Sequence, residues 1–126
     1  MENRVYKGFR DLKVYQLSFQ LALEINELTK TFPKEEKYAL TDQIHRSSRA
    51  VSAIIAEAWV HRKYPKSFIS KLIDSKGEAA ETEVWIDFAT AFNYINQETQ
   101  KYFIDKYDEI GRMFNGIITQ PEKFCL

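Results

Sequence analysis

Lysine and arginine side chains gather in one part of the sequence, where they could bind the phosphates of a nucleic acid. Residues 43–71 carry six cations and one carboxylate, Glu57, for a net charge of +5, whereas residues 74–87 have a net charge of −4. Such a basic stretch would make nucleic-acid binding dependent on salt. The candidate phosphate ligands are Arg46 and Arg49, which are three residues apart, and then Arg62, Lys63 and Lys66.

The same charges have a second interpretation that needs no ligand. Cations at the carboxyl end of a helix, such as Arg62 and Lys63, interact favourably with the helix dipole. The acidic residues of 74–87 can also pair with the basic residues of 43–71, either within one bundle or between subunits. The sequence leaves both interpretations open.

Histidine and glutamate spacing provides only half of a metal site. A di-metal carboxylate bundle needs four glutamates and two Glu-x-x-His repeats on facing helices. The chain has two histidines: His61 follows Glu57 by four residues and His45 follows Asp42 by three, so the second half-site is missing. We therefore predict no metal. Glu57 and Glu81 are expected to pair with an arginine or a hydroxyl, because buried carboxylates rarely stay unpaired.

The sequence gives no support for nucleophilic catalysis. The single cysteine, Cys125, is second from the end of the chain, and the four glycines are too scattered to form a phosphate-binding loop. Ser47, Ser48 and Ser52 fall in a stretch of small residues that favours close helix packing. We therefore predict that the protein is not an enzyme and has no catalytic residue, cofactor or small-molecule substrate.

Length and composition restrict the remaining possibilities. The 126 residues are enough for one domain spanning 1–126. Equal numbers of basic and acidic residues, 18 each, exclude a generally basic surface, and a hydrophobic content of 44% excludes disorder. Because the sequence has neither an apolar run of about 18 residues nor the apolar segment of a secretory signal, we expect a cytoplasmic protein without a membrane span.

The positions of proline and glycine divide the chain into long helices. Residues 9–32 and 34–64 contain neither, and residues 66–110 contain only Gly77. Short connections make neighbouring helices antiparallel, so we predict an all-α, antiparallel, up-down-up-down four-helix bundle. The predicted helices cover about residues 10–31, 36–63, 65–94 and 98–118.

Apolar residues in the first helix recur at helical spacing, without the strict alternation of a strand. The main stripe comprises Leu12, Tyr15, Phe19, Ala22, Leu23 and Asn26. It is widened by Val14, Leu17, Leu21, Ile25 and Leu28. This combined stripe is the expected buried face.

The second half of the third helix is apolar on nearly every side. One seam of mostly small residues comprises Ser75, Ala79, Thr82, Ile86 and Ala89, and a second seam comprises Trp85, Phe88, Phe92 and Ile95. A helix that is apolar all round is buried on more than one side, which in a single-layer bundle calls for another subunit. We predict a homo-oligomer with Trp85, Phe88 and Phe92 in its interface. The alternative is a monomer that encloses Trp85.

Several motifs, in this order and spacing, resemble a bacterial family of four-helix bundles, the 23S rRNA intervening-sequence proteins. The resemblance covers about residues 9–118. Its motifs are FRDLKVY at 9–15, TFP at 31–33, QIHRSSRAV at 43–51, IAEAW at 55–59, HRKYP at 61–65, FISKL at 68–72 and EAAETEVW at 78–85.

This resemblance implies an antiparallel four-helix bundle that assembles into a homopentamer. Some members are encoded inside intervening sequences of 23S rRNA genes and carry a ribosomal-protein label. A relative, the accessory variability determinant of diversity-generating retroelements, forms a basic pentameric barrel that binds a reverse transcriptase and nucleic acid. No enzymatic activity is associated with the family. The chain departs from the family at Ile54, usually Asn, and at His45, usually basic, which removes polarity or charge from the second helix.

These observations favour a non-catalytic homo-oligomeric scaffold, pentameric by resemblance, that binds RNA or a ribonucleoprotein partner. The residues predicted to contact the partner are Arg46, Arg49, Arg62, Lys63 and Lys66. One alternative is a protein–protein adaptor without nucleic-acid binding, in which these cations only balance acidic neighbours. The other alternative, a metal-dependent enzyme, would need clustered carboxylates.

Overall fold

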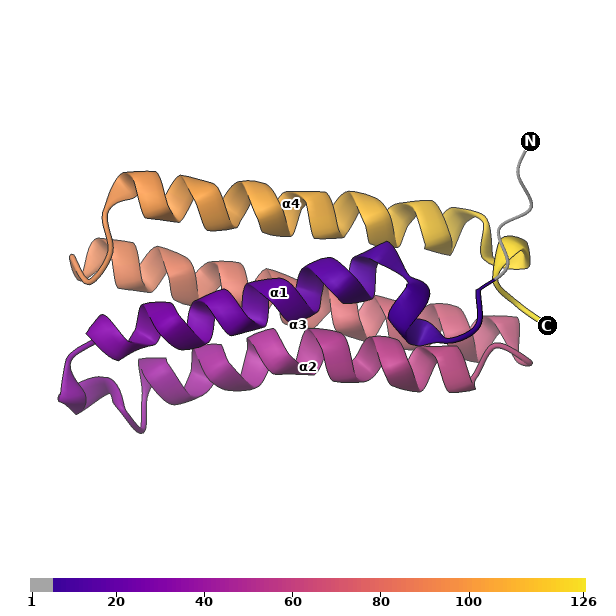
Figure 1. The fold of residues 1–126 in the computed structure, drawn as a ribbon, viewed down its shortest axis with the longest axis horizontal. Helices are drawn as coiled ribbons and strands as arrows, with labels where there is room; N and C mark the ends of the chain where they lie inside the picture. Colours follow the sequence, from indigo (N-terminus) through magenta and orange to yellow (C-terminus); the bar gives the residue numbers. More distant parts are fainter. Residues whose placement is uncertain (1–5) are drawn as a thin grey trace.

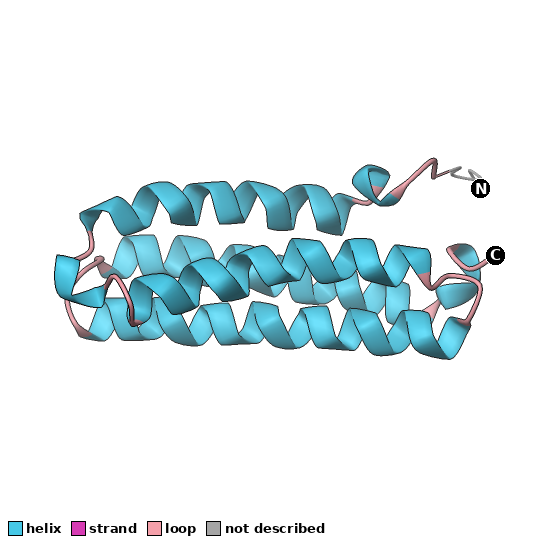
Figure 2. Ribbon diagram, turned by 90° about the horizontal axis from the view of Figure 1, so that it is seen from below, coloured by secondary structure: helices cyan, strands magenta, loops and turns pink. Residues whose placement is uncertain are grey.

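Four long antiparallel helices make up the computed structural model, which describes residues 6–126 (Figure 1, Figure 2). Each helix packs against its neighbour in sequence, and the last closes the bundle against the first. The predicted all-α, up-down-up-down four-helix bundle is therefore confirmed. The helices are α1 (Lys13–Leu28), α2 (Leu40–Val60), α3 (Pro65–Ala91) and α4 (Gln97–Thr119).

The predicted ends of the first two helices differ from the observed ends because short 3-10 segments flank the α-helices. The first helix was predicted over residues 10–31, but α1 lies between η1 (Phe9–Asp11) and η2 (Thr29–Thr31). The second was predicted over residues 36–63, but α2 begins at Leu40, since Pro33 is followed by η3 (Lys34–Glu36), and it ends at Val60. A fourth such segment, η4 (Pro121–Lys123), follows α4.

The third helix ends at Ala91 and not at the predicted residue 94. Asn93 has a φ of 63°, in the left-handed region that asparagine tolerates at the end of a helix. The Tyr94 backbone N–H then donates to the Ala89 carbonyl at 2.9 Å, which closes the helix end. The next helix begins at once, because the Asn96 side chain accepts from the Thr99 backbone N–H at 2.8 Å and caps α4.

Large apolar side chains fill the centre of the bundle, and small hydroxyl residues lie where α2 meets its two neighbours. Ser75 donates to the Val51 carbonyl at 2.7 Å, Thr82 donates to Ser47 at 2.8 Å, and the Ser18 and Ser52 hydroxyls are 2.8 Å apart. These bonds satisfy the buried hydroxyls and let α2 approach both α1 and α3 closely. The largest fully buried side chains include Leu21, Ile25, Ile44, Ile55, Phe68, Leu72, Ile86, Tyr107, Ile110 and Phe114.

The apolar stripe predicted for the first helix is divided between the core and the surface. Val14, Leu21 and Ile25, which widen the stripe, are fully buried, together with Ser18. Most of the main stripe lies toward the α1–α2 boundary instead, with Phe19 and Leu23 half exposed. The combined stripe was therefore only partly right as a buried face. Among the described residues, no helix is both long and apolar enough to cross a membrane.

Candidate functional site

Three aromatic side chains form an exposed row along the end of α3, which we call the aromatic ridge: Trp85, Phe88 and Phe92. Phe88 and Phe92 are 45% and 51% exposed, whereas Trp85 is half-buried and donates its indole N–H to Glu81 at 3.2 Å. The ring centroids are 6.0 Å apart for Trp85–Phe88 and 5.8 Å apart for Phe88–Phe92. Within a single chain, Phe88 and Phe92 are therefore each about half exposed to water.

The start of α2 provides the other side of a shallow apolar depression next to this ridge. Ala39, Leu40 and Gln43 line it together with the ridge, and its volume is about 260 Å³. Ile95, which the sequence placed in the same seam, is buried instead. The monomeric alternative predicted an enclosed Trp85, and this side chain is half-buried, whereas Phe88 and Phe92 face outward.

Arg46 is occupied by carboxylates of α3. Its guanidinium lies 3.2 Å from Glu78 Oε2 and also forms an ion pair and hydrogen bond with Glu81. This is the pairing between basic and acidic stretches that the sequence allowed as an alternative to phosphate binding. Glu57 is likewise paired, 3.6 Å from the Lys71 ammonium, although it is exposed and not buried.

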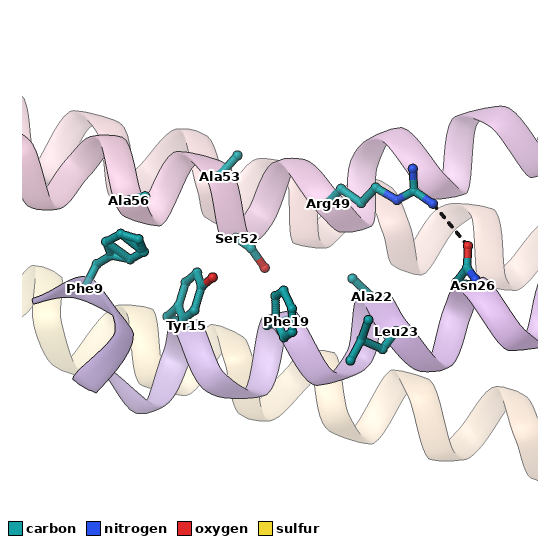
Figure 3. Close-up of a pocket in the computed structure, with 10 residues that line it drawn as sticks. All are labelled: Phe9, Tyr15, Phe19, Ala22, Leu23, Asn26, Arg49, Ser52, Ala53 and Ala56. Carbon is teal, nitrogen blue, oxygen red and sulfur yellow. Dashed lines mark hydrogen bonds between the residues drawn. The ribbon is translucent and has the colours of Figure 1, made fainter.

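Arg49 reaches the other neighbour of α2. Its Nη2 donates to the Asn26 side-chain oxygen on α1 at 3.1 Å (Figure 3). Arg46 reaches α3 and Arg49 reaches α1, so the structure does not bring the two arginines together in one basic ridge. They also lie more than two helical turns from the α2–α3 turn, where the other three predicted phosphate ligands are located.

The α2–α3 turn carries Arg62, Lys63 and Lys66. Arg62 stacks on the Trp59 ring, with its guanidinium carbon 3.6 Å from the ring centroid, and donates to the Trp59 carbonyl at 2.9 Å. Lys63 and Lys66 are exposed, and neither forms an ion pair within the described part of the chain. Tyr64, between them, is 63% exposed and was not among the predicted ligands.

Further cations lie at the same end of the bundle, because α1 begins and α4 ends there (Figure 1). We call this region the basic end. The nearby carboxylates in these segments are Asp11, which accepts from the Lys7 backbone N–H at 2.7 Å, and Glu122. The separate segments are far apart in sequence, so no local motif indicated that they meet. The cations of the basic end are Lys7, Arg10, Lys13, Arg62, Lys63, Lys66 and Lys123.

A second apolar surface, which we call the α1–α2 groove, lies between those two helices and has a volume of about 390 Å³ (Figure 3). Phe19 and Leu23 on its α1 side are 48% and 50% exposed. Its α2 side consists mainly of small residues, and Arg49 lies at its edge. The lining residues are Phe9, Tyr15, Phe19, Ala22, Leu23, Asn26, Arg49, Ser52, Ala53 and Ala56.

Two carboxyl groups meet between α3 and α4. The pKa of Glu83 is raised to about 7, mainly by burial. The charge of Asp108 and its hydrogen bond to Glu83 raise the pKa further, and the charge of Asp87 makes a smaller contribution. Two carboxylates this close favour a form in which one of them keeps a proton. Lys76 and Arg112 line the same polar groove, and Lys76 donates to Asn115 at 2.8 Å.

The raised pKa of Glu83 predicts a loss of stability with rising pH. The ordinary pKa is 4.5 and the folded pKa is about 7, so the folded protein holds more protons than the unfolded chain in this interval. The free energy of unfolding should therefore fall as pH rises from about 4.5 to about 7 and then level off. Glu83→Gln should remove this decline and stabilise the protein at pH 8 by about 1 kcal/mol, a small effect because the group is largely solvated.

Urea unfolding at a series of pH values measures this effect, with Glu122→Gln as the control at an exposed position outside the four helices. The control should keep the wild-type profile. Parallel pH profiles for wild type and Glu83→Gln would contradict the assignment of the decline to Glu83.

The histidines are engaged in separate contacts. His45 Nε2 lies 2.7 Å from the Thr29 hydroxyl, and burial, followed by the charge of Arg49, lowers the pKa of His45. His61 Nδ1 lies 2.7 Å from the Ser67 hydroxyl. Within residues 6–126, no group of three or more histidine, cysteine, aspartate or glutamate side chains is arranged to hold a metal ion.

The chain is similar to known proteins in both sequence and structure. Residues 10–116 match the family described as 23S rRNA-intervening sequence protein. A crystal structure of a protein of unknown function from the S23 ribosomal protein family of Bacteroides thetaiotaomicron is 30% identical, with a TM-score of 0.76, and the match covers 85% of this chain and 96% of that chain. No curated protein matches the sequence. Neither the family nor the similar structure is described as an enzyme.

Proposed function

Because the chain belongs to the 23S rRNA-intervening sequence protein family, we propose that it is a non-catalytic, homo-oligomeric scaffold for RNA or a ribonucleoprotein partner in the cytoplasm. The number of subunits in the proposal, five, follows from the family resemblance. The observation that carries the proposal is the aromatic ridge, where Phe88 and Phe92 remain about half exposed at the surface of a single chain.

The ridge supports self-association because exposed aromatic rows are costly in water. Burying apolar surface contributes about 25 cal/mol per Å², and contiguous exposed apolar patches usually mark an interaction site. Tryptophan and phenylalanine are also enriched among interface residues that contribute most to binding. A second copy of the chain is present at the same concentration wherever the protein is made, which makes it the simplest partner for this surface.

The basic end supports RNA as the ligand of the scaffold. Lys63 and Lys66 have no carboxylate partner within the described residues, so their charge is available to phosphates. The exposed ring of Tyr64 lies between them in sequence and could stack on an unpaired base. Of the five predicted phosphate ligands, we retain Arg62, Lys63 and Lys66, which lie together at the α2–α3 turn; Arg62 contacts Trp59 but has no carboxylate partner among the described residues. Arg46 and Arg49 lie away from this turn and bond to Glu78, Glu81 and Asn26.

Charge reversal at the turn should weaken RNA binding. We expect Lys63→Glu/Lys66→Glu to lose at least about 10-fold in affinity and to reduce the slope of log affinity against log salt by about 1 to 2. A gel-shift titration with a labelled single-stranded RNA of about 30 nucleotides, repeated at several salt concentrations, measures both effects.

The matched control is Lys34→Glu/Lys37→Glu, since these exposed lysines have the same spacing but lie at the opposite end of the bundle. It should bind like the wild type. Equal loss in both variants would point to a general charge effect, and absence of any salt-dependent binding by the wild type would exclude the RNA function.

A protein–protein adaptor is the second candidate, and the engagement of Arg46 favours it. Its pairing with Glu78 and Glu81 means that these charges serve the packing of α2 on α3. In an adaptor the ridge would still mediate assembly, but the basic end would have no nucleic-acid ligand. The gel-shift titration therefore separates the two candidates without changing the prediction for the ridge.

A further inference from the structure

The two apolar surfaces described above lie on different faces of the bundle. The aromatic ridge lies along α3 beside the start of α2, whereas the α1–α2 groove lies on the other flank of α2. We infer that the aromatic ridge of one copy packs into the α1–α2 groove of the next copy. This inference rests on the proposed self-association and names the surface that receives the ridge.

The groove has the chemistry to accept aromatic side chains. Its sides come from the rings of Tyr15 and Phe19 and from Leu23, and the α2 side is built from the small residues Ala53 and Ala56 (Figure 3). Small side chains on a helix allow a neighbouring element to approach closely, and large apolar ones on the facing helix provide contact area. The groove volume of about 390 Å³ is in the range of pockets that bury sizeable apolar groups.

The charges beside the two surfaces are complementary. Arg49 at the edge of the groove is exposed, and its partner, Asn26, is neutral. Asp87 is next to Phe88 in sequence but lies on the α4 side of α3; it is exposed and accepts from the neutral Gln100 side chain at 3.0 Å. Neither charge forms an ion pair among the described residues. An unpaired cation at the edge of the groove and an unpaired anion at the margin of the ridge favour contact of ridge with groove over contact of ridge with ridge.

A contact between two different surfaces has a consequence for symmetry. Each copy that offers its ridge still has a free groove, and each copy that offers its groove still has a free ridge. Such heterologous contacts continue from copy to copy and form a ring if the rotation between copies closes, or an open filament if it does not. Ridge-to-ridge pairing would instead end at a two-fold dimer and leave the groove empty.

Two surface variants test this inference in the full-length protein. Ala53→Arg places a long charged side chain in the groove, and Phe88→Arg does the same on the ridge; both positions are exposed, so the core is not altered. The matched control is Ala80→Arg, at an exposed alanine between α3 and α4 that belongs to neither surface. Molar mass by light scattering after gel filtration gives the assembly state, and circular dichroism checks the fold.

We expect the wild type and Ala80→Arg to form the same oligomer, and Ala53→Arg and Phe88→Arg each to be monomeric. An equimolar mixture of the two monomeric variants should then form a dimer of one copy of each, because one retains an intact ridge and the other an intact groove. This recovery occurs only if the contact is heterologous. If Ala53→Arg does not fold, Leu23→Glu at a half-exposed groove position replaces it.

Three results would overturn the inference, and they are distinguishable. If the wild type is a monomer, the proposed assembly itself is wrong. If Ala53→Arg forms the same oligomer as the wild type, the assembly does not use the groove. The groove is then free for another occupant, such as a small apolar molecule. A mixture that stays monomeric shows that the ridge does not pair with the groove.

The Arg49–Asp87 pairing has its own test. Arg49→Asp and Asp87→Arg should each weaken assembly by about 5-fold or more, and the double variant in one chain should recover most of the loss, because the reversed charges again meet between copies. Sedimentation velocity at several protein concentrations measures the change. A double variant as weak as the sum of the two singles would exclude this pairing.

Discussion

Replacing Trp85 with glutamate should convert the assembled protein into monomers that keep their helical fold. Trp85 is the half-buried member of the ridge and packs against the core, and its indole donates to Glu81. A glutamate there would put a second carboxylate beside Glu81 and would bury a charge in any apolar interface. Truncating a central aromatic residue of this kind typically costs at least about 2 kcal/mol of binding free energy per contact, or about 30-fold in affinity.

Gel filtration with light scattering measures the effect, and Trp85→Phe is the control that keeps an aromatic ring but loses the indole N–H. The control should remain assembled, with a small loss of affinity. An unchanged oligomer in Trp85→Glu would show that the ridge is not part of the interface, and the assignment of Trp85, Phe88 and Phe92 to subunit contact would then be wrong.

Replacing Ser75 with leucine should destabilise the bundle by about 3 kcal/mol. Ser75 is fully buried where α3 lies closest to α2, and its hydroxyl donates to the Val51 carbonyl at 2.7 Å. Leucine adds volume at a site without room for it and removes a hydrogen bond to a buried carbonyl. Overpacking alone costs typically about 1 to 3 kcal/mol, and the lost side-chain hydrogen bond adds about 1 kcal/mol.

The same substitution at Ser70 provides the control, because Ser70 is on the same helix but exposed. We expect Ser70→Leu to change the free energy of unfolding by less than about 0.5 kcal/mol. Urea unfolding of both variants at one fixed protein concentration gives the comparison, since assembly would make stability depend on concentration. Similar stability for Ser75→Leu and the wild type would mean that the α2–α3 contact can widen without cost.

The bundle could be predicted from the sequence because its determinants are local. Long stretches without proline or glycine, apolar residues at helical spacing and short connections leave few alternatives to antiparallel helices. The helix ends were less accurate where the backbone conformation depends on one residue. Asn93 terminates α3 through its left-handed φ of 63°, and spacing alone does not identify which asparagine adopts that conformation.

The buried face of α1 could not be assigned fully, because both of its apolar surfaces follow the same helical period. Leu21 and Ile25 lie in the core, whereas Phe19 and Leu23 line the α1–α2 groove. Large apolar side chains suit either surface. Which α1 residues lie in the core and which line the groove depends on the position of α2, and this position is a property of the folded bundle and not of the α1 sequence.

The directions of the charged side chains could not be predicted from the sequence. Arg46 and Arg49 are three residues apart, yet one side chain reaches α3 and the other reaches α1. Their direction is set by the nearest polar partner, Glu78 or Asn26, which the linear sequence does not place. The basic end could not be predicted for a different reason. Lys13, Lys66 and Lys123 are far apart in sequence, but their segments lie at the same end of the folded bundle.

The position of the α2–α3 turn at one end of the bundle would make RNA binding multivalent in a closed ring. Rotation about one axis relates all copies of such a ring, so every turn would lie on the same rim. A single pair of exposed lysines binds weakly, but neighbouring copies would present further pairs at high effective concentration, which can raise overall avidity by about 10²- to 10⁴-fold. Long RNA strands that reach around the rim would then be held far more tightly than short ones, even without any preference for sequence.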